Sequence, residues 1–187
     1  MKIGLIRHYA VKKPLLKGIV RQSQVIKWFH EYDTSTELNI FNVELCDDWE
    51  KCYSSRLPRA LLTAEKIFGA NFHSSSGFNE PSISPIFAHD IRLPFLLWGL
   101  LFRIAILFNH KSQLHTKDVL ERRITIEVEK ILSNNEKKVL IISHAFIMNI
   151  ISKLLIKKGF NGEKIGHPEH AKLYLFERPT SKNLDNE

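Results

Sequence analysis

The sequence predicts an α/β fold: a three-layer sandwich whose mostly parallel central sheet has helices on both faces and a small helical lid at about residues 80–115. Short apolar runs that suit buried strands, such as 138–143 (KVLIIS), alternate along the chain with segments whose apolar residues recur at helical spacing, such as 116–132. Strands separated by helices favour a parallel sheet. The length of 187 residues, 44% of them hydrophobic, suits one domain spanning 1–187.

Four strands are expected. At 2–7 the residues Ile3, Leu5 and Ile6 form an apolar run, and 138–143 is the clearest buried strand of the chain. The segment 51–55 reads as a strand that ends in small polar residues. The alternation over 172–177 predicts the final strand.

Helices are expected where apolar residues recur every three or four positions. Leu57, Leu61, Ala64 and Phe68 share one face of a helix that Gly69 stops. The other helices are expected at 23–32, as a short element at 43–50, from Pro94 to about 108, at 116–132, and at 145–158 with its end at Gly159. The stretch 71–85 reads as loop, and the tail from 179 as frayed.

Charge and cysteine content limit the classes of function. The net charge is +7 with a pI near 9.4, a field that attracts anions in general. The lysines are scattered and no basic run is interleaved with aromatic residues, so we expect no nucleic-acid partner. Cys46 and Cys52 are too few for a disulfide framework, which favours a reduced, cytoplasmic protein with both cysteines buried.

The apolar segment 93–108 (LPFLLWGLLFRIAILF) needs a separate test for membrane contact. It is shorter than the ~20 residues of a spanning helix, begins at Pro94 and contains Arg103. We therefore expect a buried or pocket-covering helix and regard a membrane partner as unlikely. An interfacial role stays open, because Trp98, Phe102 and Phe108 would suit one.

Three expected strands end in polar residues. Arg7 and His8 follow the first, Ser54 and Ser55 end the second, and Ser143-His144 end the strand at 138–143. In open α/β sheets ligands bind beyond the carboxyl ends of the strands. The sequence thus predicts a site that contains two histidines and an arginine.

Three motifs in this order resemble those of the histidine phosphatase superfamily, the phosphoglycerate-mutase-like phosphatases. They are IGLIRH at 3–8, YSSRLPRALLTA at 53–64 and VLIISHAFIMNII at 139–151, and the match runs from residue 3 to about 177. The resemblance implies that His8 attacks phosphorus and forms a phosphohistidine. It also implies that Arg7, Arg59 and His144 bind the transferred group, which needs fixed cations but neither a metal nor a cofactor.

The proton donor for the leaving group is less clearly marked. The family usually has a glutamate in the connection after the second helix, and Glu80 in GFNEPSISP lies at about that place. A solvated loop carboxylate is the alternative reading of Glu80. Asp90 in FAHDIRLP is its main rival, with Glu44 and Asp48 behind it.

The sequence departs from the family pattern at the residue after the first histidine. Tyr9 replaces the usual glycine, and Ala145 and Phe146 follow the second histidine. These changes argue against mutase activity and favour a phosphatase. A phospho-ligand-binding regulatory module that has lost turnover is the alternative. The expected partner is a small phosphorylated substrate, with a phosphoprotein as a second option; the particular substrate and the oligomeric state are not predicted.

Other residues have more ordinary readings. The segment 167–170 (HPEH) reads as a loop before the last strand rather than a metal site, and Ser55 as a cap for the helix that begins near Leu57. Phe95, Trp98 and Phe102 could contact an apolar part of a substrate, although core packing is favoured. Three lysines, Lys12, Lys13 and Lys17, could attract anionic substrates, although the ordinary reading of such residues is solvated loop lysines.

Overall fold

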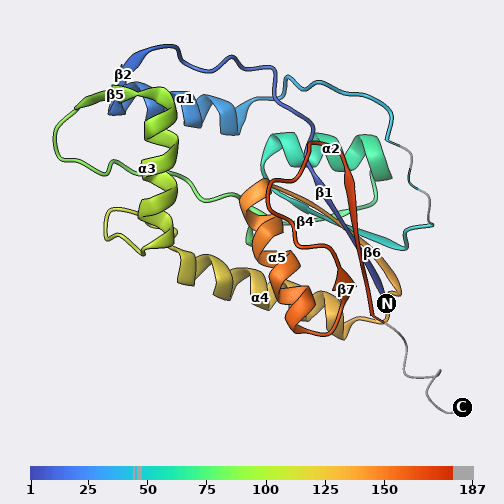
Figure 1. Ribbon diagram of the computed structural model, residues 1–187. Helices are drawn as coiled ribbons and strands as arrows, with labels where there is room; N and C mark the ends of the chain where they lie inside the picture. Colours follow the sequence, from blue (N-terminus) through green and yellow to red (C-terminus); the bar gives the residue numbers. More distant parts are fainter. Residues whose placement is uncertain (44, 46–47, 179–187) are drawn as a thin grey trace, which may run out of the picture.

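The computed structural model of the protein describes residues 1–43, 45 and 48–178 (Figure 1). Its main sheet has six strands in the order β4-β3-β6-β1-β8-β7. β1, β6, β3 and β4 run parallel to one another, whereas β8 is antiparallel to β1, and the short β7 pairs antiparallel with β8 at the edge. The strands are β1 (Lys2–Arg7), β3 (Lys51–Ser55), β4 (His73–Ser75), β6 (Lys138–Ser143), β7 (Asn161–Gly162) and β8 (Leu173–Glu177). The predicted α/β fold with a mostly parallel sheet is confirmed.

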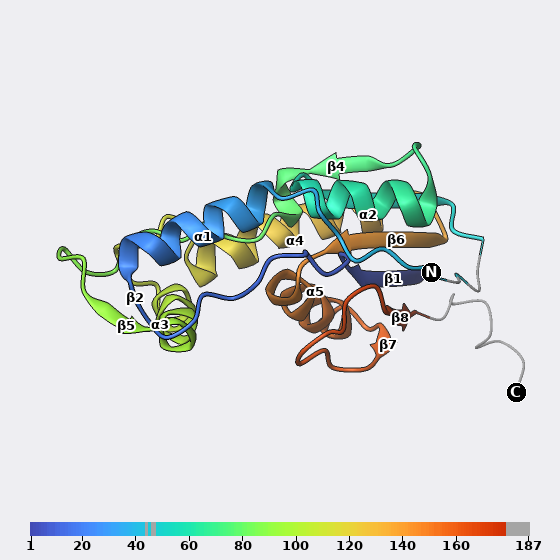
Figure 2. The same ribbon diagram turned by 90° about the horizontal axis from the view of Figure 1, so that it is seen from above.

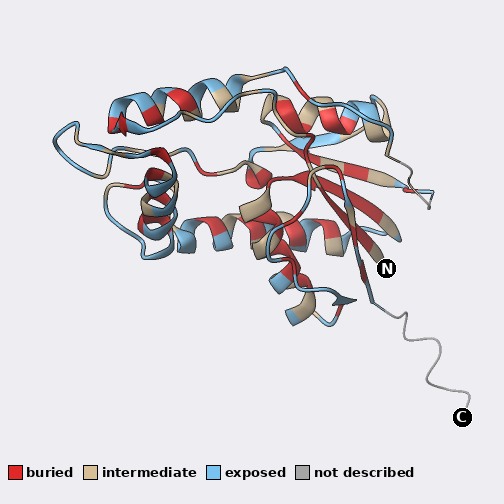
Figure 3. Ribbon diagram, turned by 45° about the horizontal axis from the view of Figure 1, so that its top comes forward, coloured by how far each residue is buried: buried red, intermediate tan, exposed pale blue. Residues whose placement is uncertain are grey.

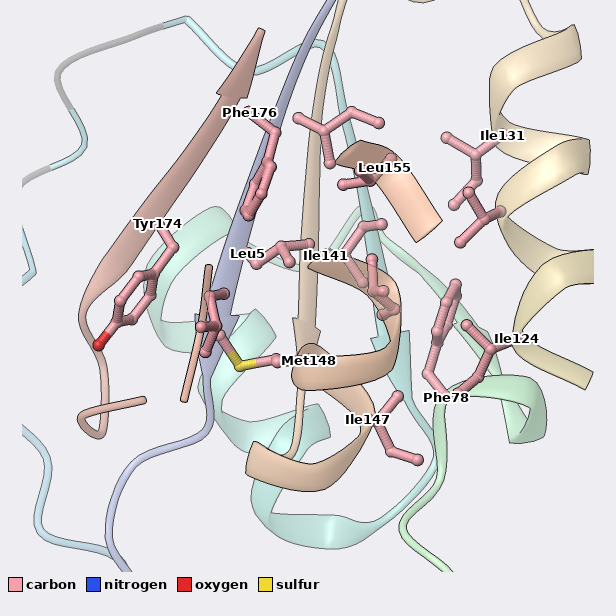
Figure 4. Packing of buried hydrophobic residues seen from close by; sticks show 14 of the residues in the cluster. Leu5, Phe78, Ile124, Ile131, Ile141, Ile147, Met148, Leu155, Tyr174 and Phe176 are labelled. Carbon is pink, nitrogen blue, oxygen red and sulfur yellow. The ribbon is translucent and has the colours of Figure 1, made fainter. Parts of the chain in front are cut away.

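Alternate residues of the central strands pack into two different apolar clusters, which places helices on both faces. Leu5 and Ile141 face one cluster, formed with helices α4 (Lys117–Ser133) and α5 (Ala145–Lys157), and Figure 4 shows their packing. Ile6 and Ile142 face the other cluster, formed with α2 (Pro58–Phe68). The apolar runs of the sequence therefore become strands buried on both sides.

A second layer of structure lies at one end of the molecule, away from the sheet (Figures 1 and 2). It consists of α1 (Gln22–Thr34), α3 (Phe95–Leu107) and a two-stranded sheet of β2 (Ile19–Arg21) with β5 (Arg92–Pro94). Its own apolar cluster is built from Val20, Val25, Trp28, Phe95, Trp98 and Phe102. We call this unit the lid. The expected lid helix is present, but the lid also takes in α1 and β2, which precede residue 80.

Most predicted helices are confirmed, with ends within one or two residues of the expected positions. Gly69 and Gly159 follow α2 and α5 with φ of 97° and 84°, the left-handed region that glycine enters without steric cost. Pro94 is the residue before α3 rather than a member of its first turn. Cys52 is buried as expected, and its burial raises the pKa of the thiol to about 12; Cys46 lies outside the described residues.

The structure differs from the sequence predictions in three places. Residues 43, 45 and 48–50 form no helix, and the indole of Trp49 belongs to the apolar cluster under α2; residues 44, 46 and 47 of this expected element lie outside the described residues. The predicted loop 71–85 contains β4, which pairs with β3 although its residues are polar, and the short 3-10 turn η1 (Ser76–Phe78). β2, β5 and β7 were not predicted; none is longer than three residues, and such a strand has no readable period.

Candidate active site

His8 stands at the carboxyl end of β1 with only 1% of its surface exposed. Its Nδ1 lies 2.6 Å from the carbonyl oxygen of Tyr9, which can only accept, so Nδ1 carries the proton and Nε2 is left with a lone pair. Burial, and next the positive charge of Arg59, hold the pKa of His8 well below its usual range. The imidazole is therefore neutral, in a single tautomer whose Nε2 is unprotonated.

His144 reaches the same place from the neighbouring strand. Because β1 and β6 are parallel with Arg7 opposite Ser143, the residues that follow them lie side by side, and the rings of His8 and His144 are 5.0 Å apart between centroids. The Ser55 hydroxyl is 2.9 Å from Oδ1 of Asn79 and donates to it, so it accepts from Nε2–H of His144 at 2.8 Å. Nδ1 of His144 is buried and has no hydrogen-bond partner among the described residues. Burial and Arg59 also hold the pKa of His144 well below its usual range.

Arg59 lies between these histidines and two carboxylates. It sits in the first turn of α2, directly after Pro58, and is completely buried. Its Nε donates to Nε2 of His8 at 3.2 Å, its Nη1 to Asp33 at 2.8 Å and its Nη2 to Glu80 at 3.1 Å. All three guanidinium nitrogens are therefore satisfied, as a buried charge requires.

Glu80 lies next to Arg59 and His144. Its Oε2 contacts Arg59 and lies 3.8 Å from Nδ1 of His144, and its side chain is 32% exposed. The preceding Asn79 is fixed by three donors: its Oδ1 accepts from Ser55 and from the backbone of residue 56, and its carbonyl accepts from Arg123 of α4. The loop thus places the partly solvated carboxylate of Glu80 beside the buried guanidinium of Arg59 and the buried imidazole of His144.

The rival carboxylates are placed differently. Asp90 accepts from the backbone and the hydroxyl of Ser23, both at 2.8 Å, and pairs with Arg21 at 3.7 Å. These contacts lower its pKa and bind it to the start of α1. Asp48 is exposed, before β3, and no interaction with the site is found for it among the described residues. Glu44 lies outside the described residues.

Arg7 is the least engaged of the candidate cations. Its Nη1 donates to the carbonyl of Pro168 at 2.9 Å, while its Nε is buried without a partner in the described part of the chain. Burial is the main cause that lowers its pKa, and its charge contributes to the low pKa of both His8 and His144. Arg7 therefore leaves one buried N–H donor that has no partner among the described residues and that a bound anion could engage, whereas the unpartnered Nδ1 of the neutral His144 carries a lone pair and can only accept.

The buried residues of α3 pack within the lid instead of facing this site. Phe95, Trp98 and Phe102 are at most 8% exposed, and the indole N–H of Trp98 donates to the carbonyl of Val20. Lys13 is paired with Glu31 at 2.8 Å. Among the described residues, no group of three or more His, Cys, Asp and Glu side chains is placed to hold a metal ion.

Solved structures share this architecture. No protein-family model and no curated protein sequence matches the chain significantly. A structure named Mycobacterial hydrolase 2 superposes with a TM-score of 0.55 at 14% identity, covering 97% of this chain and 85% of the other. YhfR from Bacillus stearothermophilus has a TM-score of 0.55, 13% identity and 96% coverage of each chain. A phosphoserine phosphatase mutant from Entamoeba histolytica, in complex with phosphoserine, has a TM-score of 0.53, 16% identity and coverage of 93% and 89%.

The chain has the histidine phosphatase fold. The fold resemblance agrees with the order of the three sequence motifs, and in this histidine phosphatase fold Arg7, His8, Arg59, His144 and Glu80 come from four separate segments of the chain.

Two residues that contact the candidate site were missed from the sequence. Asp33, near the end of α1, accepts from Arg59, and burial raises its pKa in spite of this pairing. His170 donates its Nδ1–H to the carbonyl of His8 at 2.7 Å, with the two rings 5.1 Å apart. The signal for His170 was the direction of the last strand: β8 is antiparallel to β1, so residues just before β8 lie beside the end of β1. Nothing in the sequence pattern pointed to Asp33.

Proposed function

We propose that this chain is a metal-independent phosphatase that hydrolyses phosphomonoesters through a phosphohistidine on His8. The observation that carries the proposal is the unprotonated Nε2 of His8, held in one tautomer by the Tyr9 carbonyl and placed beside Arg59 and His144. A neutral imidazole nitrogen with an oriented lone pair is the nucleophile that this chemistry needs.

In the first step Nε2 of His8 attacks phosphorus, the N–P bond forms, and the bond from phosphorus to the leaving oxygen breaks. Arg59 Nε exchanges its acceptor, Nε2 of His8, for an oxygen of the phosphoryl group. Arg7 Nε donates to another of those oxygens, and the unprotonated Nδ1 of His144 can accept from a phosphate oxygen that carries a proton. The positive charge that develops on the phosphorylated imidazole is stabilised by the hydrogen bond from Nδ1 to the carbonyl of Tyr9.

Glu80 transfers the protons. In its protonated form it gives a proton to the leaving oxygen, and it later takes one from the water that attacks the phosphohistidine. This second attack breaks the N–P bond, releases inorganic phosphate and restores neutral His8. Glu80 is favoured over Asp90 because it lies beside Arg59 and His144, whereas Asp90 is bound at the start of α1.

The test is an assay with a generic aryl phosphate in the presence of a chelator. Wild-type protein is expected to turn over, and His8→Ala to lose at least about a thousandfold in kcat. His30→Ala is the matched control, because His30 is exposed on α1 and takes no part in the site. Equal activity of wild type and His8→Ala would defeat the proposal.

The substrate is proposed only as a class, a small phosphorylated molecule, with a phosphoprotein as a second option. A panel of sugar phosphates, nucleotides, phosphoserine and a phosphopeptide, compared by kcat/KM, would rank the substrates. We do not propose mutase activity. Isomerisation of a phosphoglycerate by this protein without release of phosphate would contradict the assignment as a phosphatase. The low cysteine content supports a cytoplasmic location.

A second candidate function is a phospho-ligand-binding module without turnover. Tyr9 does not favour it, because the Tyr9 ring is buried against Leu38 and Ala171 and its hydroxyl donates to the Phe41 carbonyl. What favours it is the engagement of Arg59 by two carboxylates, whose negative charges weaken the stabilisation that Arg59 can give to a phosphoryl group in flight. Thermal stabilisation by inorganic phosphate with no hydrolysis of any phosphomonoester would select this function.

A further inference from the structure

The outer surface of α3 is a continuous apolar face. Five of its residues and the C-cap Phe108 are between 39% and 80% exposed, although all six are large hydrophobic residues, and exposed and buried positions alternate along the helix (Figure 3). They are Leu96, Leu97, Leu100, Ile104, Leu107 and Phe108. Single exposed hydrophobic residues are ordinary, but a contiguous apolar surface on a water-facing helix marks a contact site.

This face continues beyond the helix. Ile19 is opposite Pro94 in the pairing of β2 with β5, and Leu15 and Ile19 are 58% and 70% exposed. Together with the start of α3 they border an apolar groove of about 380 Å³, which Leu16 and Leu96 also line. We call the six residues of α3 and its C-cap, together with Leu15 and Ile19, the apolar face of the lid.

Two segments that contain or adjoin this face are basic, although α1 of the lid also carries Glu31 and Asp33. Segments 11–30 and 91–117 contain no Asp or Glu and nine of the 27 Lys and Arg residues of the chain: Lys12, Lys13, Lys17, Arg21, Lys27, Arg92, Arg103, Lys111 and Lys117. The rest of the chain has 18 Lys and Arg against 20 Asp and Glu, so the whole net charge of +7 comes from these two segments.

Several of these cations are available to a partner. Lys12, Lys17, Arg92, Arg103 and Lys111 are all exposed, and within the described part of the chain none of them is paired with a carboxylate. Arg103 lies on α3 itself, while Arg92 and Lys111 flank its two ends. A helix with an apolar face bordered by unpaired basic residues has the chemistry of an interfacial helix on an anionic lipid surface.

We propose that the apolar face of the lid docks on an anionic membrane surface, with α3 lying in the plane of the lipid headgroups. α3 has 13 residues and is about 20 Å long, and among the described residues no helix is long and apolar enough to cross a membrane. A second copy of the chain fits this face less well, because a two-fold contact through α3 would bring the unpaired cations of both copies together.

The test is co-sedimentation with vesicles of phosphatidylcholine, with and without phosphatidylserine. The protein is expected to bind only the vesicles that contain phosphatidylserine, and less strongly as salt is raised. The double variant Leu96→Glu, Leu100→Glu is expected to lose at least about tenfold in binding. Both positions are exposed, so the fold is kept; Ile126→Glu with Leu175→Glu, at exposed hydrophobic positions of α4 and β8, is the matched control.

A second pair of variants tests the charges. Arg92→Gln and Lys111→Gln are each expected to weaken binding about fivefold, while Lys66→Gln on α2 leaves it unchanged. Absence of binding, equal binding to neutral vesicles, or an equal loss in the control variants would overturn the proposal. So would a concentration-dependent dimer in sedimentation velocity that the Leu96→Glu, Leu100→Glu variant abolishes, because a second copy would then cover the face. The proposal is independent of the phosphatase activity.

Discussion

Replacing Asp33 by Asn is expected to tighten the binding of phosphate. Asp33 accepts from Nη1 of Arg59 at 2.8 Å and is 28% exposed, so its negative charge lies across the guanidinium from the place where a phosphate would bind. Asparagine keeps the shape and an oxygen that can accept from Nη1, but removes the charge. The variant therefore isolates the electrostatic competition between Asp33 and the phosphate.

The size of the effect follows from Coulomb's law. A carboxylate and a phosphate oxygen on opposite sides of one guanidinium are about 6 Å apart, and an effective dielectric constant of about 40 suits a partly solvated site. The repulsion is then about 1.4 kcal/mol for each unit of phosphate charge, which corresponds to about tenfold in affinity. The free energy of unfolding should change by less than about 1 kcal/mol, because burial raises the pKa of Asp33 and the ionised carboxylate gains little from folding.

Calorimetric titration of inorganic phosphate into Asp33→Asn and wild-type protein measures the difference. Glu31→Gln is the control: Glu31 is an exposed carboxylate on the same helix and pairs with Lys13 instead of Arg59. A Kd for phosphate that is unchanged or weaker in Asp33→Asn, in a protein that unfolds at the wild-type temperature, would refute the competition. Asp33 would then act by positioning Arg59.

Three further predictions concern the acid, the histidines and the lid. Glu80→Gln should lower kcat for an alkyl phosphate by a factor of about 10²–10⁴ but change kcat for p-nitrophenyl phosphate little, because only a poor leaving group needs a proton from Glu80. Normal hydrolysis of the alkyl phosphate by this variant would mean that another group donates the proton. The folded state keeps His8 and His144 neutral, whereas the unfolded chain protonates them near pH 6.5. Below that pH the free energy of unfolding should therefore fall by up to about 1.4 kcal/mol per pH unit for each of the two histidines. Denaturant titrations of His144→Asn should show a shallower fall with pH than wild type, and an equal fall would contradict the burial argument. Trp98→Ala should cost about 3–5 kcal/mol of lid stability, because Trp98 is fully buried and its indole N–H donates to the carbonyl of Val20. The loss should be seen as faster amide hydrogen exchange in α1 and α3. Unchanged exchange in both helices would show that the lid is not held by this side chain.

The sheet and most helices could be predicted because their signals are local. Leu5 and Ile141 belong to uninterrupted apolar runs, and α2 ends at a glycine that the chain needs for its left-handed turn. The segment before Trp49 gave the opposite result: a short helix was expected there, but its described residues are not helical and the indole packs with residues of β1 and β3 in the cluster under α2. β4 was missed because three polar residues carry no strand period.

The positions of candidate site residues could be predicted where those residues directly follow strands. They could not be predicted where a residue of the lid contacts a residue outside it. His8 and His144 are neighbours because β1 and β6 are parallel and in register, a relation that the sequence suggests. Asp33 meets Arg59 only because α1 extends from the lid to α2, and no local pattern encodes that contact. The choice between Glu80 and Asp90 depended in the same way on which loop reaches Arg59.

The central claim is that Nε2 of His8 forms a bond to phosphorus during turnover. Rapid acid-free quenching of a single turnover with labelled substrate, followed by peptide mapping, tests it directly. We expect an acid-labile, base-stable phosphate on the peptide that contains His8, absent from His8→Ala and present in His30→Ala. Turnover that proceeds with no labelled His8, or with the label on another side chain, would contradict it.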